Sequence, residues 1–305
     1  MTTERGLLGW FITLVAVCAA GSFPAVAGTE MGQYPAGAFG QMKVGILPPP
    51  GFVLENGTLA YTAKEFVNGD GSKQDLETTV LVNRTLGMWV TDKKVLGADF
   101  AMAAAIPFGN FAAPRPQPGE REALGLGDIY LQPLTLGWHR APFHVTASYG
   151  AFAPTGRYEF GRNDNTGRGF WSHLLTLGGT YLQDAPRPWH FTLQGRYEIP
   201  MEIQGTDIRP GQAFLIEYGV GKQISDRIDL GLVGYGAWQT TDIKGSDFKG
   251  DPRNYRYMGL GPEIQFKAIQ RKDWLLMVTL RSYFDFDVRN APRGNLTILS
   301  IAAAF

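Results

Sequence analysis

The chain is short of cysteine, histidine and net charge, and each shortage excludes a class of function. Its single cysteine, Cys18, lies in the apolar N-terminal stretch, so the remainder offers no disulfide, thiolate nucleophile or cysteine-based metal site. Because 28 basic residues balance 28 acidic ones, no basic field indicates a nucleic-acid partner. The four histidines show no metal-binding spacing, and no phosphate-binding loop is present. We therefore expect neither an enzyme nor a cofactor-binding protein.

Long apolar runs are also absent, except at the N-terminus. The mean hydropathy is −0.11, too low for a protein with several transmembrane helices. Near the start, Arg5 precedes the apolar run 7–20, and Ala25 and Ala27 form a small-residue cleavage site. This pattern predicts a secretory signal peptide over residues 1–27, and an uncleaved anchor helix is the alternative.

What the sequence has instead is glycine, proline and segments of alternating polarity. With 39 glycines and 19 prolines, many short strands and turns are favoured over helices. Over residues 189–199, odd positions carry Trp, Phe, Leu, Gly, Tyr and Ile, whereas even positions carry His, Thr, Gln, Arg and Glu. A period of two with one apolar face predicts a β-strand.

The connections between such segments alternate in length. We expect strands near residues 53–66, 78–90, 94–107, 126–138, 142–153, 172–183, 188–200, 212–223, 227–240, 255–268, 273–287 and 293–305. The connections are then alternately long and short, beginning with a long one at 67–77 and a short one at 91–93; only 288–292 is short on the long side. An even strand count with tight turns at one end is typical of outer-membrane barrels. The sequence thus predicts an all-β fold, a transmembrane antiparallel β-barrel of about twelve strands over residues 53–305.

Aromatic residues at strand ends favour a membrane setting. In this layout the tryptophans after the expected signal peptide fall at two levels: Trp89, Trp138, Trp189 and Trp274 at the short-turn ends, and Trp171 and Trp238 near the long-loop ends. Two such girdles mark the two interfaces of a bilayer. The chain ends on Phe305 after an amphipathic last strand. A terminal aromatic of this kind predicts recognition by the barrel-assembly machinery.

Residues 28–52 differ from the rest. Glycine, proline and small residues dominate, and the Pro48–Gly51 run stops any strand. We interpret this segment as a periplasmic lead-in or as a plug folded into the lumen. An extra strand near residues 38–46 is the alternative.

Several short motifs resemble the outer-membrane family called phenol meta-pathway degradation-like. They lie at residues 34–37, 48–51, 127–129, 133–139, 156–159, 165–173, 205–207, 210–212 and 217–221. The resemblance covers nearly the whole chain after the expected signal peptide, and the motifs are specific in combination rather than singly. It implies a barrel from gene neighbourhoods for aromatic catabolism, with a role in uptake of hydrophobic compounds. No ligand-binding residue carries over.

Strand parity identifies the side chains expected to line the pore. They are Asp128, Tyr130, Arg196, Glu198, Glu217, Asp229, Tyr235, Glu263, Lys267, Arg281, Tyr283 and Asp285. The same parity places Asp99 and Asp287 on the lumen face. Acidic residues then outnumber basic ones eight to three, so an open pore should disfavour anions. Alternatively, these groups pair with one another and with the N-terminal segment, which closes the lumen.

The predicted loop after residue 153 is rich in charge. Among its glycines it carries Arg157, Glu159, Arg162, Asp164 and Arg168. One interpretation is a loop folded into the pore, where opposed charges form a constriction. The other is a solvated outer loop, whose arginines could hold lipopolysaccharide phosphates.

These observations favour one function over two rivals. We expect an outer-membrane channel of a Gram-negative bacterium for passive uptake of small, hydrophobic or aromatic compounds. Its partners would be outer-membrane lipid, lipopolysaccharide, the assembly machinery and a small-molecule solute. A closed structural or adhesive barrel without transport is the first rival. A lipid-modifying enzyme is the second, although no Ser–His pair lies on the lipid face at the outer rim.

Overall fold

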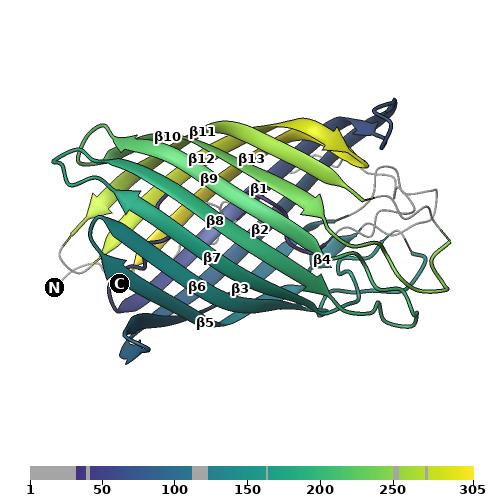
Figure 1. Cartoon of the computed structure of the whole chain (residues 1–305), viewed down its shortest axis with the longest axis horizontal. Helices are drawn as coiled ribbons and strands as arrows, with labels where there is room; N and C mark the ends of the chain where they lie inside the picture. The colour runs from purple at the N-terminus through teal and green to yellow at the C-terminus, as the bar shows by residue number, and fades with distance from the viewer. Residues whose placement is uncertain (1–31, 39–41, 112–122, 163, 250–253, 272–273) are drawn as a thin grey trace, which may run out of the picture.

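The chain folds into strands that wrap around a filled interior. The computed structural model describes residues 32–38, 42–111, 123–162, 164–249, 254–271 and 274–305, so the expected signal peptide lies outside the described residues. Within them the strands are β1 (Gly51–Val67), β2 (Lys73–Val95), β3 (Ala98–Asn110), β4 (Leu124–Leu126), β5 (Ile129–Arg140), β6 (Phe143–Ala153), β7 (Ser172–Leu182), β8 (Trp189–Pro200), β9 (Ala213–Gln223), β10 (Ile228–Gln239), β11 (Arg256–Gln270), β12 (Leu275–Arg289) and β13 (Ala291–Ala304) (Figure 1). No helix in this described part is long and apolar enough to cross a membrane.

Twelve of these strands close into an antiparallel barrel. Each long strand pairs with its neighbours in the chain, and β1 pairs with both β2 and β13, which seals the wall. The short β4 adds a three-residue ladder to the end of β3. The predicted fold class and the even strand count are therefore confirmed for the described residues.

The connections gather by length at the two ends of the barrel. In Figure 1 the long-loop end lies at the right, and the short turns and the C-terminus lie at the left. The described long loops include residues 154–171 and 201–212. The short-turn end includes the two-residue links Leu96–Gly97 and Ala141–Pro142.

Two predicted connections are wrong in position. The long loop expected at 67–77 shrinks to residues 68–72, because β1 and β2 continue as a hairpin beyond the barrel wall. The turn expected at 91–93 lies inside β2, and the chain reverses instead at Leu96–Gly97. Both of these residues have positive φ, 52° and 74°, as a tight two-residue hairpin turn requires.

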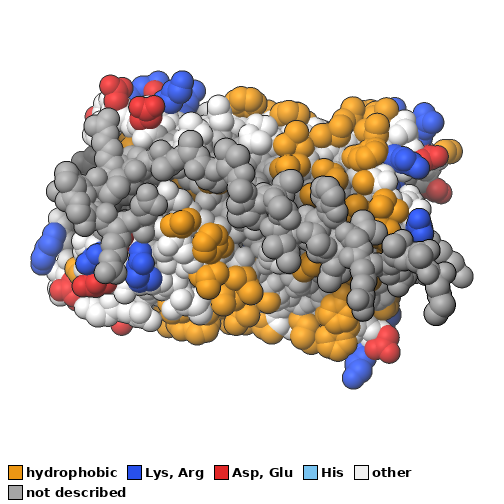
Figure 2. Space-filling view, turned by 180° about the vertical axis from the view of Figure 1, so that it is seen from behind, with side chains coloured by type: hydrophobic (Ala, Val, Ile, Leu, Met, Phe, Trp, Pro, Cys, Tyr) orange, Lys and Arg blue, Asp and Glu red, His pale blue; other side chains and the backbone are white. Residues whose placement is uncertain are grey.

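Side chains alternate between an apolar outer face and the lumen. In β8 the outward Leu193 is 56% exposed, whereas its neighbour Gln194 is 6% exposed. Figure 2 shows hydrophobic side chains along the wall, with acidic and basic side chains gathered toward both ends. Trp89, Trp171 and Trp189 are all exposed on the outside. An apolar wall between charged ends is the surface of a protein that spans a bilayer with strands.

One predicted lumen residue breaks the alternation. Asp287 has a φ of 46°, and the pairing of β11 with β12 is irregular between Arg256 and Met258. The side chain therefore turns outward, where it pairs with Arg256 at 3.1 Å. The expectation that Asp287 faces the lumen is wrong, because a left-handed backbone shifts the parity of the strand end.

Candidate functional site

The interior of the barrel holds part of its own N-terminus. We call residues 32–38 and 42–50 the lumen segment. Its Tyr34, Ala36 and Met42 are each 3% exposed and pack in the main buried cluster with side chains of the wall. An extra wall strand near residues 38–46 is not formed, because the described part of this stretch consists of turns.

Backbone amides of the lumen segment donate to carboxylates of the wall. Glu198 accepts hydrogen bonds from the amides of Gln33 and Tyr34. Glu217 accepts from the Tyr34 hydroxyl at 2.7 Å and from the Gly37 amide at 2.8 Å. A segment without regular structure has unpaired amides, and buried amides must find acceptors. The wall carboxylates supply them.

The second half of the segment is held in the same way. Glu263 accepts from the Met42 amide at 3.2 Å, and Asp229 forms an ion pair with Lys43. The Gly45 amide donates to the Thr180 hydroxyl at 3.0 Å. A Cβ at Gly45 would lie 2.6 Å from the His144 carbonyl oxygen, so only glycine lets the backbone lie this close to the wall.

Three buried ion pairs surround the segment. They are Arg84–Glu55, Arg196–Glu217 at 3.2 Å and Arg281–Glu263 at 3.6 Å. Each joins side chains from adjacent strands of the wall. Arg196 also lies over the Tyr34 ring, 4.6 Å from its centroid, a favourable cation–π geometry. Each buried charge of these pairs thus has an opposite charge on an adjacent strand.

Two chambers remain beside the lumen segment. The loop-side chamber encloses about 240 Å³ and is lined mainly by apolar side chains, among them Leu59, Val80, Val82, Phe111, Phe152 and Ile298. The turn-side chamber encloses about 430 Å³ and reaches Pro48 and Ala304 at the short-turn end. Both lie against β1, β2, β3, β5 and β6, and the turn-side chamber also reaches β8, β11, β12 and β13.

The structure places the twelve predicted pore-lining residues inside the barrel wall, but few of them face a chamber. Asp128, Tyr130, Arg196 and Lys267 line one or both chambers. Glu198, Glu217, Asp229 and Glu263 instead hold the lumen segment. The other four are buried within the wall lining: Tyr235, Arg281, Tyr283 and Asp285. Asp99, the remaining residue of the parity set, lies at the short-turn end beside Lys94.

Asp285 shows why burial does not make these residues a ligand site. Its carboxylate accepts hydrogen bonds from the Tyr235 hydroxyl at 2.6 Å, the Tyr61 hydroxyl at 2.8 Å and the Gly294 amide at 3.0 Å. All of these donors come from the wall. The cluster therefore fixes the strands β1, β10, β12 and β13 to one another.

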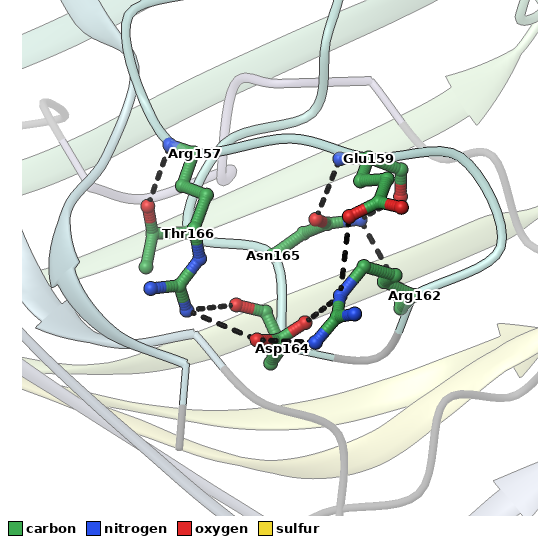
Figure 3. Close-up of polar contacts among 6 residues, drawn as sticks. All are labelled: Arg157, Glu159, Arg162, Asp164, Asn165 and Thr166. Carbon is green, nitrogen blue, oxygen red and sulfur yellow. Dashed lines mark hydrogen bonds and ion pairs between the residues drawn. The ribbon is translucent and has the colours of Figure 1, made fainter. Parts of the chain in front are cut away.

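The charged loop 154–171 folds mainly on itself (Figure 3). The Arg162 guanidinium binds both carboxylate oxygens of Asp164, at 2.7 and 3.1 Å. This bidentate contact lowers the pKa of Asp164. Arg157 contacts Asp164 as well, and Glu159 lies 3.5 Å from Arg162. Four of the five predicted loop residues thus form one network, rather than opposed charges across a pore.

The fifth residue, Arg168, lies at the chamber. Its amide donates to Asp128 at 2.8 Å, and the Gly156 amide donates to the same carboxylate at 3.0 Å. Asp128 therefore fastens both ends of the loop above the loop-side chamber, which Arg168 also lines. No group of three or more potential metal-ligating side chains occurs among the residues the structure describes.

Sequence parity missed Glu55 and Arg84, which both line the turn-side chamber. In β1 and β2 the outward face carries Asn56, Thr58 and Asn83, whereas the inward face carries Val80 and Val82. Polarity therefore does not separate the two faces there. For Arg84 the available signal was a lone charge in the middle of β2, because a mid-membrane charge faces the lumen.

The fold and the filled lumen define an outer-membrane β-barrel. A family model described as "Putative MetA-pathway of phenol degradation" matches residues 60–301, so the chain belongs to this family. The crystal structure of the COG4313 outer membrane channel from Pseudomonas putida F1 is similar, with a TM-score of 0.68 and 15% identity over 90% of this chain and 100% of that chain. That similarity shows a shared fold.

Two further solved structures are more distant. OmpT of Vibrio cholerae has a TM-score of 0.38 and 7% identity over 87% of this chain and 100% of that chain. A mutant of TodX, a monoaromatic hydrocarbon channel, has a TM-score of 0.35 and 10% identity over 84% and 90%. Neither similarity bears on function. A search of curated proteins finds no match.

Proposed function

We propose that this outer-membrane barrel is a channel for passive uptake of small hydrophobic or aromatic compounds. The observation that carries the proposal is the loop-side chamber. It is apolar, it lies beneath the long loops, and it contains the aromatic rings of Phe111, Tyr130 and Phe152. An apolar cavity of roughly 150 Å³ can hold one benzene ring, so a chamber of about 240 Å³ has room for a substituted ring.

The lumen segment fits the role of a plug with a passage beside it. It blocks the half of the lumen that faces β7 to β12, through Glu198, Glu217 and Glu263. The loop-side chamber lies against the other half, and the turn-side chamber extends along the segment and reaches β8, β11 and β12 as well. A passage narrowed in this way slows hydrated solutes, and it leaves apolar contacts for a flat ring.

The relatives support the same proposal. The family description names phenol degradation, and the structure with the same fold is titled an outer membrane channel. A channel supplies no chemistry, which agrees with the mutual pairing of the histidines and carboxylates in the wall. His190, for example, binds Asp229 at 2.8 Å.

A closed structural barrel is the second candidate. The observation that favours it is the strong fixation of the lumen segment, in which Glu217 alone accepts from Tyr34 and Gly37 and pairs with Arg196. In that case the chambers would be packing defects and no solute would pass. Its outer loops would then be the functional surface, and lipopolysaccharide would meet the half-exposed side chains of Arg157 and Arg162 beside their partner Asp164.

Uptake of radiolabelled phenol into liposomes distinguishes these candidates. Because neutral phenol also crosses lipid quickly without protein, its entry is followed by stopped flow, and the rate with protein is compared with that of protein-free liposomes. A channel raises the rate, and a variant lacking residues 28–50 raises it further. If neither form exceeds the protein-free rate, the closed barrel is correct and the proposed uptake is excluded.

A further inference from the structure

We propose that Arg84, Glu55 and Tyr130 form a junction that divides the solute path into two compartments and decides which solutes cross. This inference rests on the proposed channel function and identifies its selective element. The two chambers share two lining residues, Arg84 and Tyr130, among the described residues. Any solute that moves from one chamber to the other must therefore pass these two side chains.

Arg84 is held across the path from three sides. It extends inward from β2 and forms an ion pair with Glu55 of β1, and its guanidinium donates to the Ala38 carbonyl at 3.1 Å. Gly57 lies directly opposite Arg84 in the β1–β2 ladder. A Cβ there would lie 3.7 Å from the Arg84 Nη2, an ordinary van der Waals contact, so the guanidinium lies along β1 against position 57. The contact with Ala38 links the lumen segment to the junction.

Tyr130 is fixed on the opposite side. Its ring packs against Phe152 with centroids 4.8 Å apart, and its hydroxyl donates to Gln132 at 2.8 Å. A Cβ at Gly150 would lie 2.3 Å from the Tyr130 hydroxyl, so the ring occupies the space that this glycine leaves. The Tyr130 side of the junction thus depends on a glycine in the neighbouring strand.

The chemistry of the junction favours neutral flat solutes. Arg84 and Glu55 neutralise each other, and their side chains are 12% and 9% exposed. A hydrated ion would have to compete with a buried ion pair or shed its water, and both are costly. An aromatic ring can instead lie between the guanidinium and the Tyr130 ring, both of which stack on π faces. A polar substituent would meet the guanidinium.

Two alanines of β3 allow the junction to be tested from both sides. Ala105 lines the loop-side chamber, and Ala103, two residues away on the same inward face, lines the turn-side chamber. Ala105→Cys and Ala103→Cys place one thiol on each side. Because the only native cysteine, Cys18, lies in the expected signal peptide, the unsubstituted protein is the blank. The probe is methanethiosulfonate ethylammonium, applied to one face of a planar bilayer at a time.

The junction predicts opposite patterns for the two thiols. From the long-loop face, Ala105→Cys should react roughly tenfold faster than Ala103→Cys, because the cationic probe must cross the constriction to reach the latter. From the short-turn face the order should reverse. Equal rates from one face, or no reaction of either thiol, would overturn the proposal, since the barrier would then be absent or lie elsewhere.

Opening the junction should remove the difference in reaction rate between the two thiols. The double substitution Glu55→Gln and Arg84→Ala avoids leaving a buried charge without its partner, and Tyr130→Ala opens the other side if the double variant fails to fold. In either background, Ala103→Cys should react within about twofold of Ala105→Cys from the long-loop face. Lys222→Ala is the matched control, because it removes a cation from the outside of the wall, where Lys222 lies over the Trp189 ring. The junction is refuted if Ala103→Cys still reacts slowly from the long-loop face in both opened variants. Heat-modifiability on gels checks that each variant has folded.

Phenol uptake separates this inference from the channel function itself. If the thiol pattern holds but wild-type protein does not speed phenol entry, the junction exists and the proposed function fails. If phenol enters through the wild type but removal of the ion pair leaves thiol protection unchanged, the function stands and the junction is refuted.

Discussion

Neighbouring residues of one strand meet different solvents in this protein. Ala104 of β3 lies mid-strand between the outward side chains Met102 and Ile106, which are 36% and 48% exposed. Ala103, next to it, lines the turn-side chamber. A cation placed at either position adds the same side chain to the same strand, and only its surroundings differ.

This contrast gives the first prediction. Ala104→Arg should destabilise the barrel by ~2–4 kcal/mol, the cost of arginine on the lipid face near the bilayer midplane. Ala103→Arg should cost much less, because the turn-side chamber has room for the side chain and access to water. Urea titration of folding into lipid vesicles measures both. Equal destabilisation would show that the assignment of the two faces is wrong.

How well parity works depends on the strand. In β8, apolar and polar residues separate completely, so Arg196 and Glu198 could be placed inside from the sequence. In β1 and β2 both faces are mixed, and the outward Asn56 and Asn83 satisfy each other through two hydrogen bonds. Such a pair hides the polarity of its face, which is why Glu55 and Arg84 could not be placed.

Among the elements, the lumen segment depends most on its glycines. Gly37 has a φ of +84°, and a Cβ there would lie 2.7 Å from the Tyr235 ring. Gly205, in an outer loop, has a nearly equal φ of +79° but nothing within 4 Å. Both positions need the left-handed backbone that glycine tolerates, and only Gly37 also needs the space.

The second prediction compares these two glycines. Gly37→Ala should displace the lumen segment and increase ion conductance, whereas Gly205→Ala should leave conductance unchanged. Both should lose a similar, small stability from backbone strain, about 1 kcal/mol. Single-channel recording gives the first quantity, and heat-modifiability on gels checks that the barrel persists. Unchanged conductance in Gly37→Ala would show that the segment adjusts without leaving its site.

A pair of outer loops is joined by one carboxylate. Asp207 accepts hydrogen bonds from the Ser246 hydroxyl at 2.6 Å and from the amides of Ser246 and Asp247 at 2.7 and 2.8 Å. These bonds, that from Ser246 first, lower the pKa of Asp207 to about 2. The unfolded loop has the ordinary value, roughly 3.9.

The third prediction follows from the sign of this shift. Because the folded pKa is the lower one, the stabilisation is fully present above the ordinary value and disappears as the pH falls through about 2. The Ser246 and Asp247 amides should therefore stay protected from hydrogen exchange at every pH above roughly 4. Asp207→Asn should expose them at all pH values. Loss of protection in the native protein near pH 5 would contradict the assignment.

At the scale of strands and loops, the sequence predicted the positions of strands better than those of loops. Alternation and turn residues placed nine of the eleven connections near their observed positions, but the hairpin formed by β1 and β2 continues past the wall. Nothing in residues 67–77 marks where the membrane ends. The loop 154–171 was recognised as charged, yet its internal pairing through Asp164 required knowledge of the backbone.

For the molecule as a whole, the position of the lumen segment determines what the acidic side chains of the lumen contact. Its partners in the wall are 46 to 221 residues away in the chain, and the segment has no periodic pattern. The sequence therefore could not decide between a periplasmic lead-in and a plug. Once the segment is in place, Glu198, Glu217, Glu263 and Asp229 face its amides and Lys43 rather than a solute.

The charges that line the two chambers are mainly basic, whereas the residues that strand parity places on the lumen face are mainly acidic. Among the described lining residues, five are basic and two are acidic: Lys43, Arg84, Arg168, Arg196 and Lys267 against Glu55 and Asp128. The excess of acids counted from parity belongs to the contacts of the lumen segment. The intact protein should consequently show no preference for cations, and a weak preference for anions is expected.

Removing residues 28–50 should reverse that preference, and this is the last prediction. The deletion takes away Lys43 and leaves Glu198, Glu217, Glu263 and Asp229 without their partners in the segment, so these carboxylates face water. Conductance should rise, and the reversal potential in a salt gradient should shift toward cation selectivity, as acidic pore linings produce. The shift in reversal potential should shrink at about 1 M salt, where the screening length is only about 3 Å.

If the deletion protein conducts more but keeps the selectivity of the intact protein, the carboxylates do not face the enlarged pore. If conductance does not change, the segment does not obstruct the path, because a solute already bypasses it through the two chambers.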